Sequence, residues 1–175
     1  MKKVKVPKIL IAEKELKAGV KKLAKILNQD YQGEEVVIIC VLKGSFIFCA
    51  DLVRYLDFPV TIEFISVSSY GAGKKSSGEV KLNFDLTPCV EGKNLLIVED
   101  IIDTGLTIDY LFHLFKARKP KSLKLATLLF RKSTANKLVN VDYKAFDLAD
   151  EFVVGYGLDY GGQFRSLPYL GYIDD

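Results

Sequence analysis

The sequence predicts an α/β fold built on a mainly parallel sheet flanked by helices, and two observations carry this prediction. Three largely apolar runs, 36–42, 95–98 and 123–130, have the length and composition of strands that are buried on both faces. Amphipathic helical patterns separate these runs, and alternation of strand and helix is typical of a parallel sheet with right-handed crossovers. With 175 residues, of which 49% are hydrophobic, the chain can bury a sizeable core, and we expect residues 1–175 to form a single domain.

The first expected elements are a helix, a buried strand and a second helix. Residues 13–27 place their apolar side chains on one helical face, namely Leu16, Val20, Leu23, Ala24 and Leu27. The buried run 36–42 ends at the turn 43–45, and residues 46–53 then suit a helix. Lys43 is either an ordinary solvated charge or a ligand-binding residue. Its place at the carboxyl end of a buried parallel strand, where open α/β sheets bind ligands, favours the second reading.

An antiparallel pair is expected next. Residues 59–68 and 80–86 alternate apolar and polar side chains, which predicts two strands with one exposed face. The intervening segment 69–79 is small, polar and long for a hairpin, so we expect either a lid or a disordered tip. Its Gly-Ala-Gly-Lys-Lys-Ser sequence is not a nucleotide-binding P-loop, because Lys follows the Gly-Lys pair and no helix is expected after it.

The most informative stretch is 95–107, in which an apolar strand stops at Glu99 and Asp100 and a Thr-Gly turn leads into a helix. Thr107 is expected to cap this helix. The apolar stripe of the helix consists of Ile108, Leu111, Phe112 and Phe115. A helix N-terminus after a tight loop attracts anions, so the loop amides and the hydroxyls of Thr104 and Thr107 suit a phosphate. Glu99 and Asp100 suit ribose hydroxyls or a hydrated divalent cation. A solvated acidic strand end is the alternative, but the order of these features favours a functional site.

The rest of the chain supplies another strand and a loop-rich tail. The strand over 123–130 ends at Arg131 and Lys132, and 143–148 and 152–156 are shorter strand-like pieces. His113, the only histidine, lies off the helical stripe and is expected to be solvated. This removes Ser-His, Cys-His and multi-histidine metal mechanisms.

The composition limits the kinds of partner and the cellular location that we expect. The formal net charge of +3 is mild, and no stretch concentrates Lys and Arg enough to demand nucleic-acid binding. No apolar run reaches the roughly 20 residues of a membrane-spanning helix, and the N-terminus lacks the apolar core of a signal peptide. Cys40, Cys49 and Cys89 have no paired-ligand spacing and are expected to be reduced thiols. We therefore expect a cytoplasmic protein without membrane or nucleic-acid partners.

Taken whole, the chain resembles the hypoxanthine-guanine phosphoribosyltransferases from the first helix to the tail. The stretch 95–107 is similar, nearly letter for letter, to the phosphoribosyl-pyrophosphate motif of type I phosphoribosyltransferases. Residues 42–45 look like the pyrophosphate loop of that family, Ser69-Tyr70 like the tip of its mobile lid, and 151–160 with Arg165 like its purine-clamping tail. The resemblance implies the type I phosphoribosyltransferase fold, with a small hood formed by the chain ends.

The resemblance also implies which residues bind the two phosphate groups. The 5'-phosphate would be held by Asp103, Thr104, Gly105, Leu106 and Thr107. The pyrophosphate would be received by Lys43, Gly44 and Arg165, with a cis peptide bond before Lys43.

The ribose, the metal and the base have their own implied partners. Glu99 and Asp100 would address the ribose hydroxyls and, through water, a magnesium ion. Asp159 would face a second magnesium ion beside the base. Phe152 would stack on the purine, and the backbone of Val153 would pair with the purine's edge.

One residue departs from the family pattern. Arg131 stands where the family usually has a Lys that contacts the 6-oxo group of the purine. Alternatively, the correspondence shifts by one residue and Lys132 fills that role.

The implied reaction is purine salvage. An Mg²⁺-dependent enzyme would transfer the 5-phosphoribosyl group from phosphoribosyl pyrophosphate to N9 of hypoxanthine or guanine, giving IMP or GMP and pyrophosphate, and would form a homodimer or homotetramer. Without a usable histidine a carboxylate is the natural proton acceptor, and Asp103 is our candidate. One alternative is a xanthine- or pyrimidine-preferring enzyme, which Phe152 and Asp159 disfavour. The other is a nucleic-acid-binding regulator on the same fold, which Lys43 and Asp103 disfavour.

Overall fold

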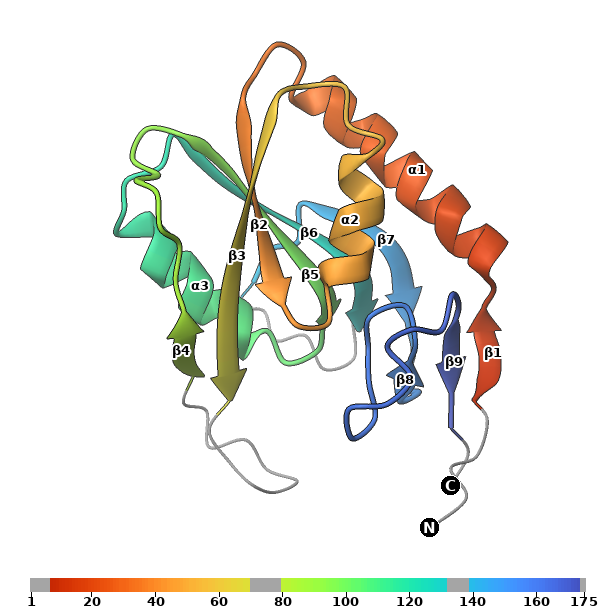
Figure 1. Ribbon diagram of the computed structural model, residues 1–175. Helices are drawn as coiled ribbons and strands as arrows, with labels where there is room; N and C mark the ends of the chain where they lie inside the picture. Colours follow the sequence, from red (N-terminus) through yellow and green to blue (C-terminus); the bar gives the residue numbers. More distant parts are fainter. Residues whose placement is uncertain (1–6, 70–79, 132–138, 174–175) are drawn as a thin grey trace.

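The core of the molecule is a six-stranded sheet, seen in a computed structural model that describes residues 7–69, 80–131 and 139–173 (Figure 1). Its strand order is β4-β3-β2-β5-β6-β7, with bounds β2 (Val36–Leu42), β3 (Val60–Ser69), β4 (Val80–Phe84), β5 (Asn94–Ile102), β6 (Ser122–Arg131) and β7 (Tyr143–Leu148). All neighbours are parallel except β3 and β4, which are antiparallel. The structure confirms the predicted sheet and the predicted antiparallel pair.

Three helices cover the two faces of this sheet. Helices α1 (Glu13–Asp30) and α2 (Phe46–Val53) pack on one face, mainly over β2, β5 and β7, and α3 (Leu106–Lys116) packs on the other (Figure 1). The predicted apolar face of α1 is the buried one, and the first six residues of β2 and the first five of β5 are buried because helices lie on both sides of them. None of the helices in the described ranges combines the length and apolarity that crossing a membrane requires.

A second, smaller sheet forms the predicted hood. Strands β1 (Lys8–Ile11), β9 (Leu170–Tyr172) and β8 (Val153–Val154) pair antiparallel in that order, so both ends of the chain contribute to it. The arrowheads of β2, β5, β6 and β7 point toward this hood (Figure 1). The hood therefore stands over the carboxyl ends of the parallel strands, the edge at which ligands bind in open α/β sheets.

The start of α3 differs from the prediction that Thr107 caps it. The N-cap residue is Gly105, with φ +81°, no side-chain hydrogen bond caps the helix, and Thr107 is already its second residue. The turn needs a left-handed conformation at position 105, which glycine adopts without a steric penalty. Strand β5 also continues through both carboxylates to Ile102, so Glu99 and Asp100 lie near its end and not after it.

The apolar side of β3 is more exposed than its alternation suggests. Ile62 and Phe64 are 40% and 44% exposed, and Phe84 of β4 is 53% exposed, whereas Ile65 is buried on the opposite face. Phe84 pairs with Ser66, which lies on the same face as Ile62 and Phe64 because side chains alternate along a strand. The α1–α2 layer lies mainly over other strands, so this part of the sheet keeps an exposed apolar surface, which we call the β3–β4 face (Ile62, Phe64 and Phe84).

Candidate active site

A cavity of about 360 Å³ lies between the carboxyl ends of the strands and the hood. It brings together ten of the predicted site residues: Lys43, Gly44, Glu99, Asp100, Asp103, Arg131, Phe152, Val153, Asp159 and Arg165. These residues come from the ends of β2, β5 and β6 and from the tail after β7, four segments that are far apart in the sequence. Parallel strands make this convergence possible, because their carboxyl ends meet at one edge of the sheet.

The remaining predicted phosphate ligands form the turn beside this cavity. Thr104 is exposed, Gly105 is buried, and Leu106 and Thr107 begin α3. Because no side chain caps the helix, its first amides are available to an incoming anion. This geometry supports a phosphate cradle made of backbone N–H groups, with glycine holding the turn and the Thr hydroxyls at its rim.

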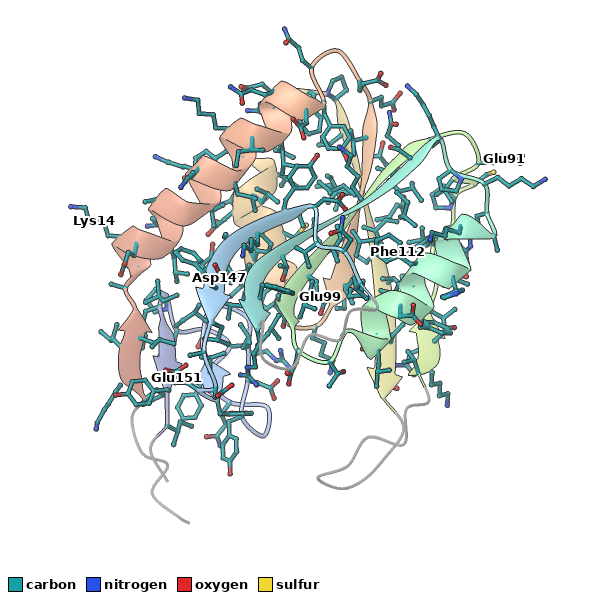
Figure 2. All side chains as sticks on the ribbon, turned by 180° about the vertical axis from the view of Figure 1, so that it is seen from behind. Lys14, Glu91, Glu99, Phe112, Asp147 and Glu151 are labelled. Atoms are coloured by element: carbon teal, nitrogen blue, oxygen red, sulfur yellow. The ribbon has the colours of Figure 1, made fainter. Side chains whose placement is uncertain are left out.

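Two neighbouring carboxyl groups form the acidic floor of the cavity. Burial, followed by the nearby Asp100 carboxylate, raises the pKa of Glu99 well above its usual range. Burial also raises the pKa of Asp100, although hydrogen bonds, including one from the Ile101 amide at 2.7 Å, partly offset this effect. Glu99 Oε2 is buried and has no hydrogen-bond partner among the described residues, and Figure 2 shows Glu99 in the middle of the sheet. The two acids are thus placed to bind hydroxyl groups or a cation.

The predicted pyrophosphate ligands, which we call the pyrophosphate side (Lys43, Gly44 and Arg165), combine a tight loop with an arginine. The Leu42–Lys43 peptide bond is cis, as expected, and Lys43 is exposed at the cavity. Gly44 lies so close to Asp100 that an added Cβ would overlap its carboxylate, so only glycine fits there. Arg165 forms an ion pair with Asp159 at 2.5 Å (Nη2 to Oδ1) and donates to the Gly157 carbonyl at 2.6 Å.

Arg131, the predicted ligand of the base, links two parts of the cavity. Its Nη2 donates to the Glu151 carbonyl at 2.7 Å, and its Nη1 lies 3.4 Å from Asp103 Oδ2. Its Nε is buried without a hydrogen-bond partner in the described ranges. Figure 2 shows Glu151 beside the hood, so the guanidinium bridges the end of β6 and the hood segment.

Aromatic rings close the same side of the cavity. Phe152 is exposed, and its ring stands edge-on to the ring of Tyr160, with 5.8 Å between centroids. Val153 is buried at the start of β8 and also lines the cavity. An exposed ring beside fixed backbone groups is suited to a planar, hydrogen-bonding ligand such as a purine.

The donor set fits a hydrated magnesium ion. Magnesium prefers carboxylate and water oxygens and is usually held by one or two carboxylates together with substrate phosphates. Glu99, with its unpartnered buried oxygen, and Asp100 provide such oxygens, and Asp159 provides others on the far side of the cavity. Within the described ranges no group of three or more His, Cys, Asp or Glu side chains could hold a metal by itself. The arrangement therefore suits a metal that is shared with a phosphorylated substrate.

Sequence reasoning gave no role to four residues that also line the cavity. Leu42, Ile101 and Leu158 lie within the motifs found in the sequence, and Val41 lies outside them. Apolar residues at strand ends carry no signal that separates cavity lining from core. The lid prediction at Tyr70 and the alternative Lys132 lie outside the described residues, as does the side chain of Ser69.

Comparisons with known proteins point to one family. A model of the phosphoribosyl transferase domain matches residues 8–161. The chain is 47% identical to a hypoxanthine-guanine phosphoribosyltransferase of Bacillus subtilis over 166 residues, which are 95% of this chain and 92% of the relative. A segment that is 26% of the bifunctional protein TilS/HprT of Listeria innocua is 46% identical over 95% of this chain. A crystal structure of a hypoxanthine-guanine phosphoribosyltransferase from Bacillus anthracis superposes with a TM-score of 0.92 at 44% identity, covering 97% of this chain and all of that one.

Proposed function

This chain belongs to the phosphoribosyltransferase family as a hypoxanthine-guanine phosphoribosyltransferase of purine salvage, and from that premise we propose how its residues carry out the reaction. The enzyme breaks the bond between C1' of phosphoribosyl pyrophosphate and the pyrophosphate oxygen and forms a bond from C1' to N9 of hypoxanthine or guanine, giving IMP or GMP. One observation carries the proposal: a single cavity joins an acidic floor, three cationic side chains and an exposed aromatic ring.

The sugar-phosphate half of the cavity positions the donor. Amides at the start of α3 and the Thr104 and Thr107 hydroxyls hold the 5'-phosphate, and Glu99 and Asp100 hold the ribose hydroxyls. Lys43, the Gly44 backbone and Arg165 hold the leaving pyrophosphate, whose negative charge grows as the C1'–O bond breaks.

Magnesium completes this half of the site. Glu99 and Asp100 would hold one ion through water, and Asp159 would face a second. The ions supply positive charge that neutralises the pyrophosphate. The support for this assignment is the oxygen donor set and the unpartnered Glu99 oxygen.

The base half selects a 6-oxopurine and removes its proton. Phe152 stacks on the ring, the backbone of Val153 pairs with its edge, and Arg131 donates to the 6-oxo group. Arg131 cannot accept a hydrogen bond from the 6-amino group of adenine, so adenine is excluded. Asp103 takes the proton from N7 as N9 attacks. The contact of Asp103 with Arg131 supports this placement of the carboxylate.

The decisive test of the mechanism is Asp103→Asn. We expect kcat to fall by about 10²–10⁴-fold, the range typical of lost general acid-base catalysis, with the melting temperature unchanged. Asp147→Asn is the matched control, because Asp147 lies on β7 with an exposed side chain paired to Lys144, away from the cavity, and should leave kcat unchanged. Wild-type turnover in Asp103→Asn would remove Asp103 from its assigned role.

A steady-state assay with hypoxanthine, guanine, xanthine, a pyrimidine base and adenine tests the substrate assignment. We expect turnover with hypoxanthine and guanine and none with adenine or a pyrimidine. Preference for xanthine or a pyrimidine would contradict the proposal.

Two further properties belong to the proposal. We propose a cytoplasmic location, supported by three cysteines that are free thiols. We also propose a homodimer or homotetramer, with the β3–β4 face meeting a second copy of the chain. Its support is an apolar composition that matches the cores of homodimer interfaces.

A further inference from the structure

A buried tyrosine ties the tail to the helix that follows the pyrophosphate loop. The Tyr156 hydroxyl donates to Asp51 Oδ2 at 2.7 Å, and Asp51 lies on α2, which begins directly after Lys43, Gly44 and Ser45. Tyr156 is only 4% exposed and has a φ of +48°, an unusual value for a residue other than glycine. Burial, followed by the Asp51 carboxylate, raises the pKa of Tyr156, so the hydroxyl keeps its proton and acts as the donor.

The residue after this tyrosine packs directly on the pyrophosphate loop. A Cβ added to Gly157 would overlap the carbonyl oxygen of Gly44, and a Cβ added to Gly44 would overlap the Asp100 carboxylate. Gly44 is therefore held between the tail on one side and the acidic floor on the other. The position of the loop depends on the position of the tail, because no side chain separates the two backbones.

The same tail segment carries the cationic and acidic groups of the pyrophosphate side. The Gly157 carbonyl accepts from Arg165 Nη1 at 2.6 Å, and the Gly157 amide donates to the Arg165 carbonyl at 3.0 Å. Arg165 is in turn paired with Asp159 at 2.5 Å. A shift of the backbone at Tyr156 would thus move Arg165 and Asp159 together with the contact on Gly44.

We propose that Tyr156 and Asp51 are positioning residues for pyrophosphate binding, because their hydrogen bond fixes the tail against the loop. This inference rests on the proposed function, since it assigns pyrophosphate to Lys43, Gly44 and Arg165. In the proposed function the base is bound by Arg131, Phe152 and Val153, and the hydrogen bonds described here for Tyr156, Asp51 and Arg131 do not join the two groups. Loss of the Tyr156–Asp51 hydrogen bond, which we call the tether, should therefore weaken binding of phosphoribosyl pyrophosphate far more than binding of hypoxanthine.

The chain offers a matched control for a merely structural role. The Tyr143 hydroxyl donates to Asp30 Oδ2 at the same distance, 2.7 Å, and joins α1 to β7. Tyr143 is also buried, but it is the first residue of β7 and lies at the end of the sheet opposite the cavity. Tyr143→Phe removes the same kind of hydrogen bond, together with the one that this hydroxyl accepts from Lys124 Nζ at 2.8 Å, without touching the pyrophosphate side.

The test compares Tyr156→Phe and Tyr143→Phe in steady-state assays and by calorimetric titration with magnesium pyrophosphate in the absence of base. For Tyr156→Phe we expect KM for phosphoribosyl pyrophosphate and Kd for magnesium pyrophosphate to rise about tenfold, with KM for hypoxanthine changed less than about twofold. For Tyr143→Phe we expect a lower melting temperature with all three constants unchanged. Asp51→Ala should reproduce Tyr156→Phe, and Asp51→Asn, whose amide oxygen still accepts the phenol, should restore near wild-type constants.

The results of these assays distinguish a positioning role of Tyr156 and Asp51 from a purely structural one. If Tyr156→Phe only lowers the melting temperature, or raises both KM values equally, the positioning role is wrong. If Tyr156→Phe does not fold, Asp51→Ala decides, because Asp51 is partly exposed on α2 and its truncation removes the same hydrogen bond. If the wild-type enzyme transfers to neither hypoxanthine nor guanine, the proposed function fails, whereas the pyrophosphate titration still tests the tether.

Discussion

Glu99 combines burial with a like-charged neighbour, and this combination costs stability. Its carboxyl group has a pKa above the ordinary value of 4.5, so above that pH the folded state binds more protons than the unfolded state. The free energy of unfolding therefore falls as pH rises from the ordinary pKa toward the raised one. The buried Glu99 carboxyl group therefore lowers the free energy of unfolding of the ligand-free protein.

Replacing Glu99 by Gln should stabilise the ligand-free protein. The change removes the buried charge and keeps the shape, so we expect about 0.5–2 kcal/mol more stability at neutral pH, seen as a rise of a few degrees in the melting temperature. Activity should fall in the same variant, because Glu99 is the proposed ligand of the ribose hydroxyls and of magnesium. An unchanged or lower melting temperature by calorimetry at pH 7 without ligands would contradict this account.

Arg131 gives a prediction on base selection. Arg131→Ala should lower kcat/KM for hypoxanthine and guanine. The expected loss of transition-state stabilisation is about 1–3 kcal/mol, because the proposed polar partner of the base is removed. Lys132→Ala should have much less effect in the same assay. If the two variants exchanged these effects, the family's lysine position would be Lys132 and our assignment of Arg131 would be wrong.

At the residue scale, sequence reasoning identified polar residues that the structure brings to one cavity, but not their local partners. Glu99, Asp103 and Arg131 were identified because a motif and a family resemblance mark them. The bond from Arg131 to the Glu151 carbonyl joins residues 20 positions apart through the fold, and no spacing rule encodes it. The Asp51–Tyr156 pair, 105 positions apart, was missed for the same reason.

At the scale of elements, one ion pair links the end of β4 to the end of α3. Arg118 Nη2 lies 2.5 Å from Asp85 Oδ2, and this hydrogen bond is the main cause of a lowered pKa for Asp85. A lowered folded-state pKa means that the pair stabilises the protein above the ordinary pKa of 3.8 and that this stability is lost as pH falls through the lowered value.

Asp85→Asn should therefore destabilise the protein at neutral pH and not in acid. Both side chains are partly exposed, so we expect a loss below about 1 kcal/mol that shrinks in high salt. Urea unfolding of wild type and variant at pH 7 and near pH 3 would measure it. An equal difference at both pH values would show that the pair does not act through its charge.

Elements with a clear period were predicted well. The helix over α1 and the strands β2 to β7 follow from apolar runs and alternation. Strand β8 lies within the predicted strand-like piece 152–156, but β1 and β9, with four and three residues, are too short for a period and were not predicted, because only pairing across the chain defines them. The cap at Gly105 was misassigned because hydroxyl residues are the commonest caps, whereas this turn needed a left-handed backbone.

At the scale of the molecule, the β3–β4 face predicts how copies associate. Phe64→Glu places a charge in an apolar surface, so it should shift the protein toward monomers in light scattering coupled to size-exclusion chromatography. Ile9→Glu is the control, because Ile9 is also exposed but lies in the hood on β1. An oligomer that survives Phe64→Glu, or one that Ile9→Glu dissociates equally, would place the interface elsewhere.

The pairing of β1 with β9 has a consequence for the order of events during protein synthesis. Lys8 lies opposite Tyr172, so β1 must wait for a partner that is made much later in synthesis. The neighbouring strands of the large sheet are separated by far shorter stretches of chain and can assemble earlier. The hood, which needs β9, would therefore be the later of the two sheets to close during synthesis.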